Sequence, residues 1–397
     1  MQFQQENRLK ILTNKTNTKM KIGIVLYPTF GGSGVVGTEL GKALAKKGHQ
    51  IHFITYSQPV RLGSFRENIF YHEVAVSDYP LFEYQPYETE LTSKMVDVVK
   101  YEQLDLLHVH YAIPHASAAY MAKQILKSQG ITIPYITTLH GTDITLVGKD
   151  PSFEPVITFC INESDAVTAV SESLKRDTYK HFNTTREIHV IPNFIAPTIG
   201  ISNASAEVRQ KYAKDSERIL CHVSNFRKVK RVEDVVQIFA KVNQQLPSKL
   251  ILAGDGPERY AAERLVRELK LCEKVIFLGK VSDTAHVLEI SDLFLLPSET
   301  ESFGLAALEA MAVGVPVVSS NTGGIPEVNK HGITGFLSDV GDIEDMAKNA
   351  LEILTNPETM HKFKIQALEM SHEFDLVKIL PMYEKIYFDL IKDVSKH

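Results

Sequence analysis

PSETESFGLAALEAMAVG, residues 297–314, is the stretch from which the fold of this chain can be worked out. The apolar run Leu293–Leu296 directly before it predicts a buried strand. A polar break follows, and a helical pattern begins at Ser302, which is a good N-cap residue. Gly314 stands where we expect this helix to end, and Val315–Ser319 predicts the next strand. This order of elements indicates an open α/β sheet.

Two carboxylates and a set of backbone amides give this turn its chemistry. Glu301 precedes the expected helix, and Glu309 lies inside it between apolar residues, where a carboxylate costs free energy unless it has a partner. The free N–H groups of Ser302, Phe303 and Gly304 would form an anion site at the carboxyl end of the strand. A sugar nucleotide requires amides for its phosphates and carboxylates for its hydroxyl groups. The alternative is an ordinary strand–helix unit whose glutamate pairs with a core arginine.

The composition describes a globular protein and excludes several classes of partner. The chain has 397 residues, enough for two to three domains; 44% are hydrophobic, 23% are charged, and the formal net charge is −5. Because no long basic tract is present, we expect neither nucleic acid nor a membrane as a partner. The three cysteines are widely spaced in apolar runs, which fits neither a disulfide framework nor a zinc site and favours a cytoplasmic location. The sequence leaves open whether the protein forms a homo-oligomer.

The two ends of the chain are helical or irregular rather than membrane-spanning. Residues 1–19 are polar and rich in Lys, Asn and Gln, and we expect a disordered N-terminal extension there. No apolar run approaches the length of a membrane span. Helical patterns fill residues 342–397, and the last helix should begin near Leu376.

The first ordered segment has the pattern of a βαβ unit. Strands are expected at 21–27 and 50–56, with a glycine-rich loop at 28–37 and a helix at 38–47 between them. The glycines match a dinucleotide-binding fingerprint by spacing, but Ser57 and Gln58 stand where an acidic residue would hold a ribose. NAD is therefore disfavoured, although the glycines still allow backbone to approach a ligand closely.

The same alternation continues through both halves of the chain. Further strands are expected at 104–110, 134–139, 165–170 and 187–191, and in a second half at 218–223, 249–253 and 275–278. Residues 57–90 look irregular, and residues 195–217 look like a linker. We therefore expect two doubly wound domains.

The sequence SNFRKVKR, residues 224–231, places several cations after the first strand of the second half. Arg227 and Lys230 could neutralise a diphosphate, with the arginine binding in bidentate fashion. The alternative is a solvated charged face, which we favour for Lys228 and Arg231.

Polar residues also gather at the expected strand ends of the first half. His140 leaves a strand and precedes a glycine, where ligands bind in open α/β sheets, so a binding or acid–base role is favoured. Tyr111, Thr138 and Asn193 lie at other strand ends, with turn capping and packing as alternatives. His108 and His110 share one side of a strand but have no acidic partner, which disfavours a metal. We expect no cofactor and no metal, and neither a nucleophile elbow nor a Walker loop is present.

These motifs together resemble the retaining glycosyltransferases of family four, which have the GT-B architecture of two facing Rossmann-like domains with a cleft between them. The signatures are GGSG at 31–34, SNFRKVKR at 224–231, and Glu301 and Glu309 with SFG between them. More narrowly, HVHYAIPHA at 108–116 and TTLHGTDIT at 137–145 resemble the branch of that family in the bacillithiol pathway. The resemblance runs from about residue 21 to the C-terminus.

That resemblance implies UDP-N-acetylglucosamine as donor and L-malate as acceptor. On the donor side it implies that Glu309 binds the ribose and that Glu301, with the Phe303 and Gly304 amides, holds the sugar hydroxyls. Arg227 and Lys230 would clamp the diphosphate, and His140 would lie near the sugar. The remaining implied positions are Ser33, Gly34 and Asn225 for the donor, and Ser33, Tyr111, Thr138, Asn193 and Arg227 for the acceptor. Many relatives have Gly-Arg where this chain has Ser224–Asn225, so Arg227 would supply that cation.

The expected organisation is an acceptor-binding domain at 20–194 and a UDP-sugar-binding domain at 195–375, with a C-terminal helix at 376–397 that packs back on the first domain. Two alternatives to the implied activity remain: a family-four transferase with another UDP-sugar or acceptor, and a non-catalytic protein that binds sugar nucleotides.

Overall fold

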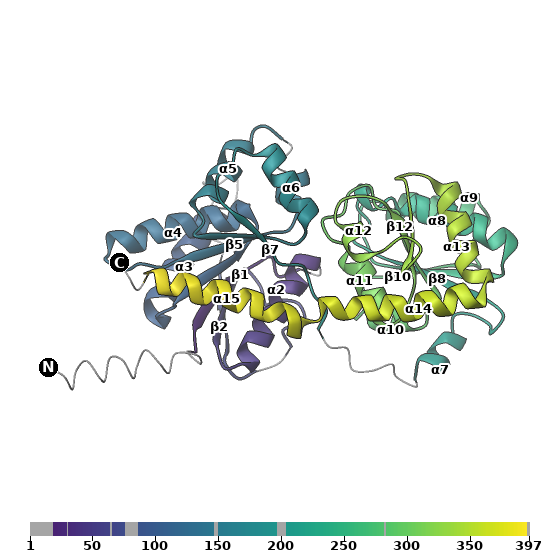
Figure 1. Cartoon of the computed structure of the whole chain (residues 1–397), viewed down its shortest axis with the longest axis horizontal. Helices are drawn as coiled ribbons and strands as arrows, with labels where there is room; N and C mark the ends of the chain where they lie inside the picture. The colour runs from purple at the N-terminus through teal and green to yellow at the C-terminus, as the bar shows by residue number, and fades with distance from the viewer. Residues whose placement is uncertain are drawn as a thin grey trace.

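The computed structural model describes residues 19–29, 31–63, 66–75, 86–146, 150–196, 204–281 and 283–394. The predicted extension at 1–19 lies outside this part of the chain except for Lys19. Within the described ranges the chain forms two parallel sheets in separate lobes (Figure 1). This arrangement confirms the prediction of two doubly wound units.

The N-terminal lobe contains a seven-stranded parallel sheet among its described residues. Its strands are β1 Lys21–Val25, β2 Gln50–Thr55, β3 Ile69–Glu73, β4 Leu106–His110, β5 Tyr135–Leu139, β6 Ala166–Ala169 and β7 Ile188–Val190. Its helices are α2 Gly32–Lys46, α3 Tyr87–Glu102, α4 Ser117–Ser128, α5 Glu154–Glu163 and α6 Glu172–His181. The strand order is β3-β2-β1-β4-β5-β6-β7, so the order reverses between β1 and β4. Ligands bind outside the carboxyl ends of strands at such a reversal.

The C-terminal lobe repeats this topology with a six-stranded sheet in the described chain. Its strands are β8 Arg218–Val223, β9 Ser248–Ala253, β10 Val275–Gly279, β11 Leu293–Leu296, β12 Val317–Ser320 and β13 Gly335–Ser338. Its helices are α7 Ala204–Gln210, α8 Val232–Gln245, α9 Arg259–Glu268, α10 Ala285–Glu289, α11 Leu305–Ala312, α12 Ile325–Val328 and α13 Ile343–Thr355. The order β10-β9-β8-β11-β12-β13 reverses between β8 and β11, the two strands that precede the basic loop and the Glu301 turn.

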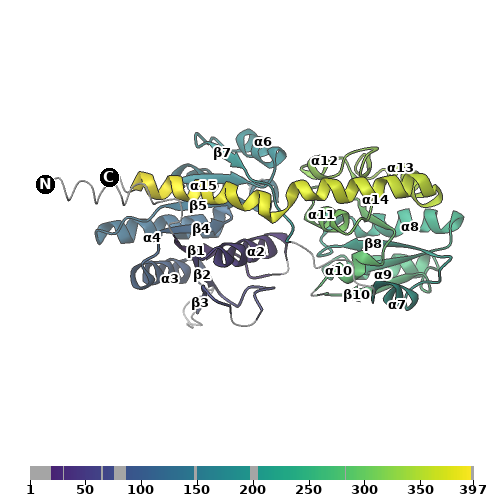
Figure 2. The same ribbon diagram turned by 60° about the horizontal axis from the view of Figure 1, so that its bottom comes forward.

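The last two helices join the lobes along one side of the molecule. Helix α14 Pro357–Ser371 lies along the C-terminal lobe, and helix α15 Leu376–Val394 lies along the N-terminal lobe, as two views show (Figures 1 and 2). The outgoing and returning connections pair with each other, because Ile195 N–H donates to Phe374 O over 3.1 Å and Leu376 N–H donates to Ile195 O over 3.1 Å. The chain therefore passes between the lobes twice at one place, while the domain boundaries themselves stay predictions.

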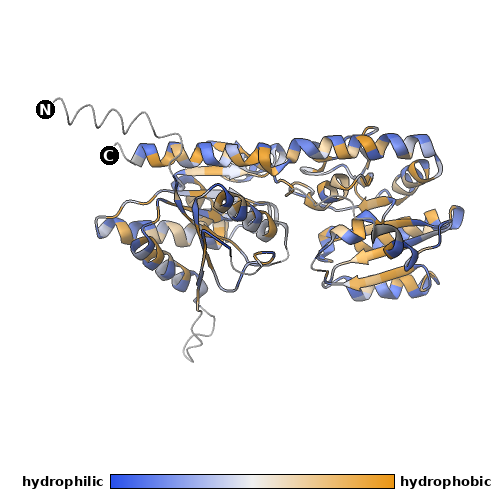
Figure 3. Cartoon of the chain, turned by 90° about the horizontal axis from the view of Figure 1, so that it is seen from below, coloured by the Kyte–Doolittle hydropathy of each residue, from blue (hydrophilic) through white to orange (hydrophobic). Residues whose placement is uncertain are grey.

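Helix α15 completes the core of the N-terminal lobe. Tyr383 and Tyr387 are fully buried and belong to one apolar cluster with Ile22, Ile24 and Ile136 of the sheet. In Figure 3 the strands of the C-terminal lobe are mostly hydrophobic, whereas the long helices along both lobes alternate in colour, as expected of helices with one buried face. No helix among the described residues has the length and apolar character that crossing a bilayer requires.

Several element boundaries differ from the sequence predictions. The glycine-rich stretch is a loop only to Gly31, and α2 begins at Gly32 rather than residue 38. The reason is packing: a Cβ at Gly34 would lie 2.5 Å from Thr29 O, and one at Gly37 would lie 2.7 Å from Leu26 Cδ2. These glycines bring a helix close to the sheet rather than extending the loop. Residues 57–90 contain the edge strand β3, and the predicted linker at 195–217 contains α7.

Candidate active site

Two loops of the C-terminal lobe meet at the reversal point of its sheet. Lys230, after β8, donates to Glu301, after β11, with 2.6 Å between Nζ and Oε2. The Glu299 N–H donates to Val229 O over 2.8 Å, which ties the two loops together. Both charged side chains are mostly buried, with exposed fractions of 20% for Lys230 and 16% for Glu301. The structure thus brings together two residues 71 positions apart that the sequence assigned to one site.

The turn after Glu301 has a different geometry from the predicted one. Helix α11 begins at Leu305, its N-cap is Gly304, and no side chain caps it, so the prediction of Ser302 as N-cap is wrong. Gly304 has φ +93°, a left-handed conformation that glycine adopts at little cost and that bends the chain away from the helix axis at this point. Phe303 is buried and packs edge-on against Phe374, with 5.5 Å between ring centres. The turn is therefore held by its phenylalanine, and its backbone amides stand before the start of a helix.

Glu309 projects from α11 toward a cation of the other lobe. Arg61 Nη1 lies 3.6 Å from Glu309 Oε1, and the carboxylate side chain is 23% exposed. Burial raises the pKa of Glu309, and the positive charge of Arg61 opposes that shift. The expected partner of the buried glutamate is thus an arginine, but one from the N-terminal lobe rather than from the core.

The remaining predicted residues of the basic loop are solvent-accessible. Asn225 and Arg227 are exposed, and Arg227 precedes the short 3-10 turn Lys228–Lys230. Within the described chain, no carboxylate pairs with the Arg227 guanidinium. That cation is free to bind an anionic ligand.

On the N-terminal lobe, Ser33 and Tyr111 contact each other at the reversal point of the sheet. The Tyr111 hydroxyl donates to Ser33 Oγ over 2.6 Å, which joins the end of β4 to the first turn of α2. Burial raises the pKa of Tyr111 to about 12, and its hydrogen bond to Ser33 opposes that shift. Gly34, the next residue, has no room for a side chain above the β1 loop. Ser33 and Gly34, which were predicted to bind the donor, therefore lie in the first turn of α2. The free backbone amides at a helix N-terminus favour an anion.

Three buried histidines, His108, His110 and His140, lie in or directly after strands β4 and β5. His108 lies 2.7 Å from the Thr138 hydroxyl through Nε2 and 2.7 Å from the Tyr387 hydroxyl through Nδ1. His110 Nδ1 lies 2.7 Å from His140 Nε2, and the two rings stack. Burial, followed by the neighbouring His115, lowers the pKa of His140 to about 3. At neutral pH His140 is uncharged, so it offers a neutral hydrogen-bonding group rather than an imidazolium acid.

Thr138, Asn193 and Asp143 differ in whether their polar side-chain atoms already have hydrogen-bond partners. The Thr138 hydroxyl also lies 2.7 Å from the Thr168 hydroxyl, so its hydrogen bonds are used inside the sheet. The Oδ1 atom of Asn193 is buried without a hydrogen-bond partner in the described chain, which leaves an acceptor available after β7. Asp143 accepts from the Ala112 N–H over 2.8 Å and from the Gly141 N–H over 3.1 Å, so its carboxylate caps backbone amides of the loops after β4 and β5.

The two halves of the site touch each other. Ser171 Oγ donates to Ser302 O over 2.6 Å, and a Cβ at Gly32 would lie 3.3 Å from Leu305 Cδ2. A Cβ at Gly141 would lie only 1.6 Å from Ser302 Oγ, so the end of β5 lies directly against the Glu301 turn. The N-termini of α2 and α11 are thus neighbours across the interface between the lobes.

Sequence analysis missed the residues that make these contacts. Arg61 lies in the stretch that looked irregular, and Ser171 belongs to no recognised motif. A single sequence gives no sign of which residues meet across two lobes, because that depends on how the lobes pack.

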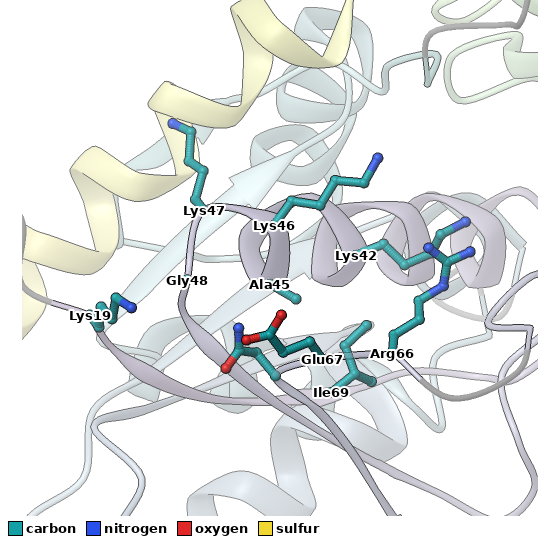
Figure 4. Close-up of a pocket in the computed structure, with 10 residues that line it drawn as sticks. Lys19, Lys42, Ala45, Lys46, Lys47, Gly48, Arg66, Glu67 and Ile69 are labelled. Carbon is teal, nitrogen blue, oxygen red and sulfur yellow. The ribbon is translucent and has the colours of Figure 1, made fainter.

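Two other features lie apart from this site. A pocket of about 580 Å³ opens at the C-terminal end of α2, and Lys42, Lys46, Arg66 and Glu67 are among the residues that line it (Figure 4). On β2 and β3, His52 and His72 form a group with Glu102 whose candidate ligand atoms lie within 4.8 Å of one another. Neither feature includes a predicted site residue, and the prediction of no metal stays a prediction.

Comparison with known proteins identifies the class to which this fold and site belong. Residues 30–198 match the family model described as Glycosyltransferase Family 4, and residues 204–370 match Glycosyl transferases group 1. Solved structures with the same fold include a sucrose-phosphate synthase from Thermosynechococcus elongatus, with a TM-score of 0.79, 21% identity and coverage of 94% of this chain and 100% of that one. Another is a glycosyltransferase from Rickettsia africae, with a TM-score of 0.76, 22% identity and coverage of 94% and 99%. The chain belongs to glycosyltransferase family 4 and has the GT-B fold.

One relative is similar over nearly the whole chain. N-acetyl-alpha-D-glucosaminyl L-malate synthase of Bacillus anthracis is 50% identical over 377 residues, which cover 94% of this chain and 98% of that protein. An uncharacterized glycosyltransferase of Methanocaldococcus jannaschii is 30% identical over 338 residues, which cover 80% of this chain and 84% of that protein. This chain is therefore a glycosyltransferase, as its motifs predicted.

Proposed function

We propose that this enzyme transfers N-acetylglucosamine from UDP-N-acetylglucosamine to the hydroxyl group of L-malate with retention at the anomeric carbon, as the first step of bacillithiol biosynthesis. The observation that carries the proposal is the 50% identity, over 94% of the chain, to a relative named for that product. A second relative, 2-deoxystreptamine N-acetyl-D-glucosaminyltransferase of Niallia circulans, is named for the same sugar and is 33% identical over 157 residues. A cytoplasmic location fits a sugar-nucleotide donor, and a homo-oligomer stays open.

The donor would bind to the C-terminal lobe. Glu309 would accept hydrogen bonds from the ribose, and the ribose would then replace Arg61 as the partner of this carboxylate. Glu301, with the amides of Phe303 and Gly304, would hold the sugar hydroxyls, and Lys230 would contact the diphosphate. The 2.6 Å contact between Lys230 and Glu301 supports this assignment, because the sugar and its phosphate are adjacent in the donor.

The acceptor would bind to the N-terminal lobe opposite the donor. The paired Ser33 and Tyr111 hydroxyls and the unpartnered Asn193 oxygen are polar groups that malate could contact. Malate carries two carboxylates, so a cation is required, and the unpaired Arg227 is the candidate in the C-terminal lobe. For Thr138 the support is weaker, because its hydroxyl already has two partners in the sheet.

The chemistry requires stabilisation of charge on the leaving group. As the glycosidic bond to the diphosphate breaks, the sugar becomes oxocarbenium-like and negative charge grows on the phosphate, where Lys230 and Arg227 would act. We propose that malate attacks from the face of departure and that a diphosphate oxygen takes its hydroxyl proton. His140, neutral at pH 7, would position the sugar rather than donate a proton. Exclusion of water between the lobes would suppress hydrolysis of the donor.

Mass analysis of the product tests this proposal. The enzyme would be incubated with UDP-N-acetylglucosamine and L-malate, and the mass and anomeric proton coupling of the product measured. The expected product is the α-linked N-acetylglucosaminyl malate, and Lys230→Ala is the control with lowered turnover. UDP release with another acceptor from a panel, but not with malate, would reassign the acceptor. Absence of UDP release with every acceptor would favour a non-catalytic binding protein.

A further inference from the structure

A carboxylate of the C-terminal lobe caps a helix of the N-terminal lobe. Glu327, in α12, accepts from the Ser173 N–H through Oε1 over 2.8 Å and from the Glu172 N–H through Oε2 over 3.0 Å. Both amides belong to the first turn of α6. The residues in contact are 154 and 155 positions apart in the chain and belong to different lobes. These two hydrogen bonds therefore form only when the lobes are together.

The amino end of α6 is a favourable place for such a contact. The first amides of a helix have no partner within the helix, and negative charge is stabilised there. Ser171, the N-cap, satisfies the Leu174 N–H through Oγ over 3.0 Å. Glu327 supplies acceptors for two further amides, and the acidic side chain of Glu172 in the same turn is exposed. In an open arrangement of the lobes, water would have to solvate both the amides and the carboxylate.

The same contact region carries the turn that holds Glu301. Ser171 Oγ donates to Ser302 O over 2.6 Å, and Gly324 N–H, at the start of α12, donates to Glu301 O over 2.9 Å. A Cβ at Gly324 would lie 2.3 Å from Ser302 O, so α12 and the Glu301 turn are packed backbone against backbone. Because α12 packs against this turn, a displacement of Glu327 would also displace the backbone that holds Glu301.

We propose that Glu327 is a positioning residue for glycosyl transfer: by capping α6 it holds the lobes together and fixes the Glu301 turn, with its Lys230 partner, against the strand ends of the N-terminal lobe. Glu327 touches no reacting atom in this proposal. Its effect on the rate arises because transfer requires a closed interface, whereas donor binding uses mainly groups of the C-terminal lobe. The inference rests on the proposed function for the position of the acceptor, but the closure of the lobes can be measured without any acceptor.

Three single variants test this role. Glu327→Ala removes both acceptor atoms, and Glu327→Gln keeps the side-chain length and one acceptor oxygen. Glu344→Ala is the matched control, because Glu344 is an exposed acidic residue of the same lobe whose ion-pair partner among the described residues is Lys241 on the surface. For each we would measure kcat, KM for the donor, the UDP dissociation constant by calorimetry, and the radius of gyration with saturating UDP by X-ray scattering. Thermal unfolding would show that each variant is folded at the assay temperature.

The expected result is a separation of turnover from binding. Glu327→Ala should lower kcat about tenfold, equivalent to about 1.4 kcal/mol, with less than a threefold change in the UDP dissociation constant and a larger radius of gyration with UDP. Glu327→Gln should lower kcat about threefold, and Glu344→Ala should match the unmodified enzyme. If the alanine variant is unstable, the glutamine variant decides the question by the same measurements.

Two outcomes would overturn the proposal. A kcat within a factor of 1.5 of the unmodified value in both Glu327 variants would remove the positioning role, and so would a loss confined to UDP affinity. If the unmodified enzyme does not glycosylate malate, the proposed function fails. The scattering measurement with UDP still decides whether Glu327 closes the lobes.

Discussion

Gly141→Ala places a single methyl group in the interface between the lobes, directly against the Glu301 turn. Gly141 lies two residues after β5 and has φ +105°, and the new Cβ would lie 1.6 Å from Ser302 Oγ and 2.7 Å from Ser302 Cβ. Ser302 can rotate its hydroxyl away, but its Cβ is fixed by the backbone. Because carbon atoms in contact prefer a separation of about 3.5–4.0 Å, the lobes must separate locally by about 1 Å.

The free-energy cost of this separation can be worked out from the hydrogen bonds that it weakens. A shift of about 1 Å would break the 2.6 Å hydrogen bond from Ser171 to Ser302 O, since hydrogen bonds beyond about 3.5 Å contribute little. It would also strain the two bonds from α6 amides to the Glu327 carboxylate. One neutral hydrogen bond is worth about 1 kcal/mol and a bond to a charged group about 1.5–3 kcal/mol, so a partial loss totals about 2–3 kcal/mol. The closed population, and with it kcat/KM for transfer, should fall about 30- to 150-fold.

The assay must separate the clash from the backbone strain. Gly130→Ala is the matched control, because Gly130 also has a positive φ, +77°, but a Cβ there meets nothing within 4 Å. It should lower stability without lowering transfer. The double variant Gly141→Ala with Ser302→Gly removes the clashing side chain but keeps the Ser302 carbonyl that accepts from Ser171, and it should recover at least tenfold of the lost kcat/KM. UDP affinity should change little in every variant.

The steric explanation would be refuted if Gly141→Ala transferred the sugar within threefold of the unmodified rate. It would also be refuted if the double variant were no more active than the single one, because backbone strain at position 141 would then account for the whole loss.

Further predictions follow from the charged groups of the site. Lys230→Ala should lower kcat at least tenfold with little change in KM, because its charge matters most as the leaving group departs; steady-state kinetics would contradict this if the loss lay wholly in KM. Glu309→Ala should weaken UDP binding by about 1.5–3 kcal/mol, the worth of hydrogen bonds to a charged acceptor, and unchanged affinity in calorimetry would remove Glu309 from the ribose site. Arg227→Lys should reduce the preference for malate over lactate, because a point charge does not reproduce bidentate geometry; a retained preference would move the second carboxylate to another residue. Burial lowers the pKa of His108 and His140 to about 3, so both stay neutral in the folded state while the unfolded chain takes up protons below about pH 6.5. The free energy of unfolding should therefore fall by up to about 1.4 kcal/mol per pH unit for each histidine between pH 6.5 and 4, and urea unfolding at pH 7, 5.5 and 4.5 would measure it.

The strand ends could be predicted from sequence because they depend on local pattern. Apolar runs followed by polar residues marked β4, β5, β8 and β11, and parallel strands place their carboxyl ends at one edge of a sheet. The resemblance to family-four glycosyltransferases implied that Lys230 and Glu301, which follow two of these strands, belong to one donor site, and their side chains do meet. Local pattern also misled, because glycines that let α2 pack on the sheet looked like a longer loop.

The contacts between the lobes could not be predicted in the same way. Arg61 meets Glu309 and Glu327 meets α6 only after two complete sheets have formed and packed together. No hydrophobic periodicity in the segments around Arg61 or Glu327 predicts these contacts.

The position of α15 has a consequence for synthesis of the protein. Domains usually fold in order as they leave the ribosome, but the sheet made first, from residues 21–190, takes Tyr383 and Tyr387 into its core from the last helix. While the ribosome still covers the C-terminus, that sheet has an open apolar face, whereas the second sheet is already complete. The lobe translated second should therefore reach its native state first. A nascent chain stalled before residue 376 should expose the N-terminal lobe to chaperones and proteases until the last helix is released.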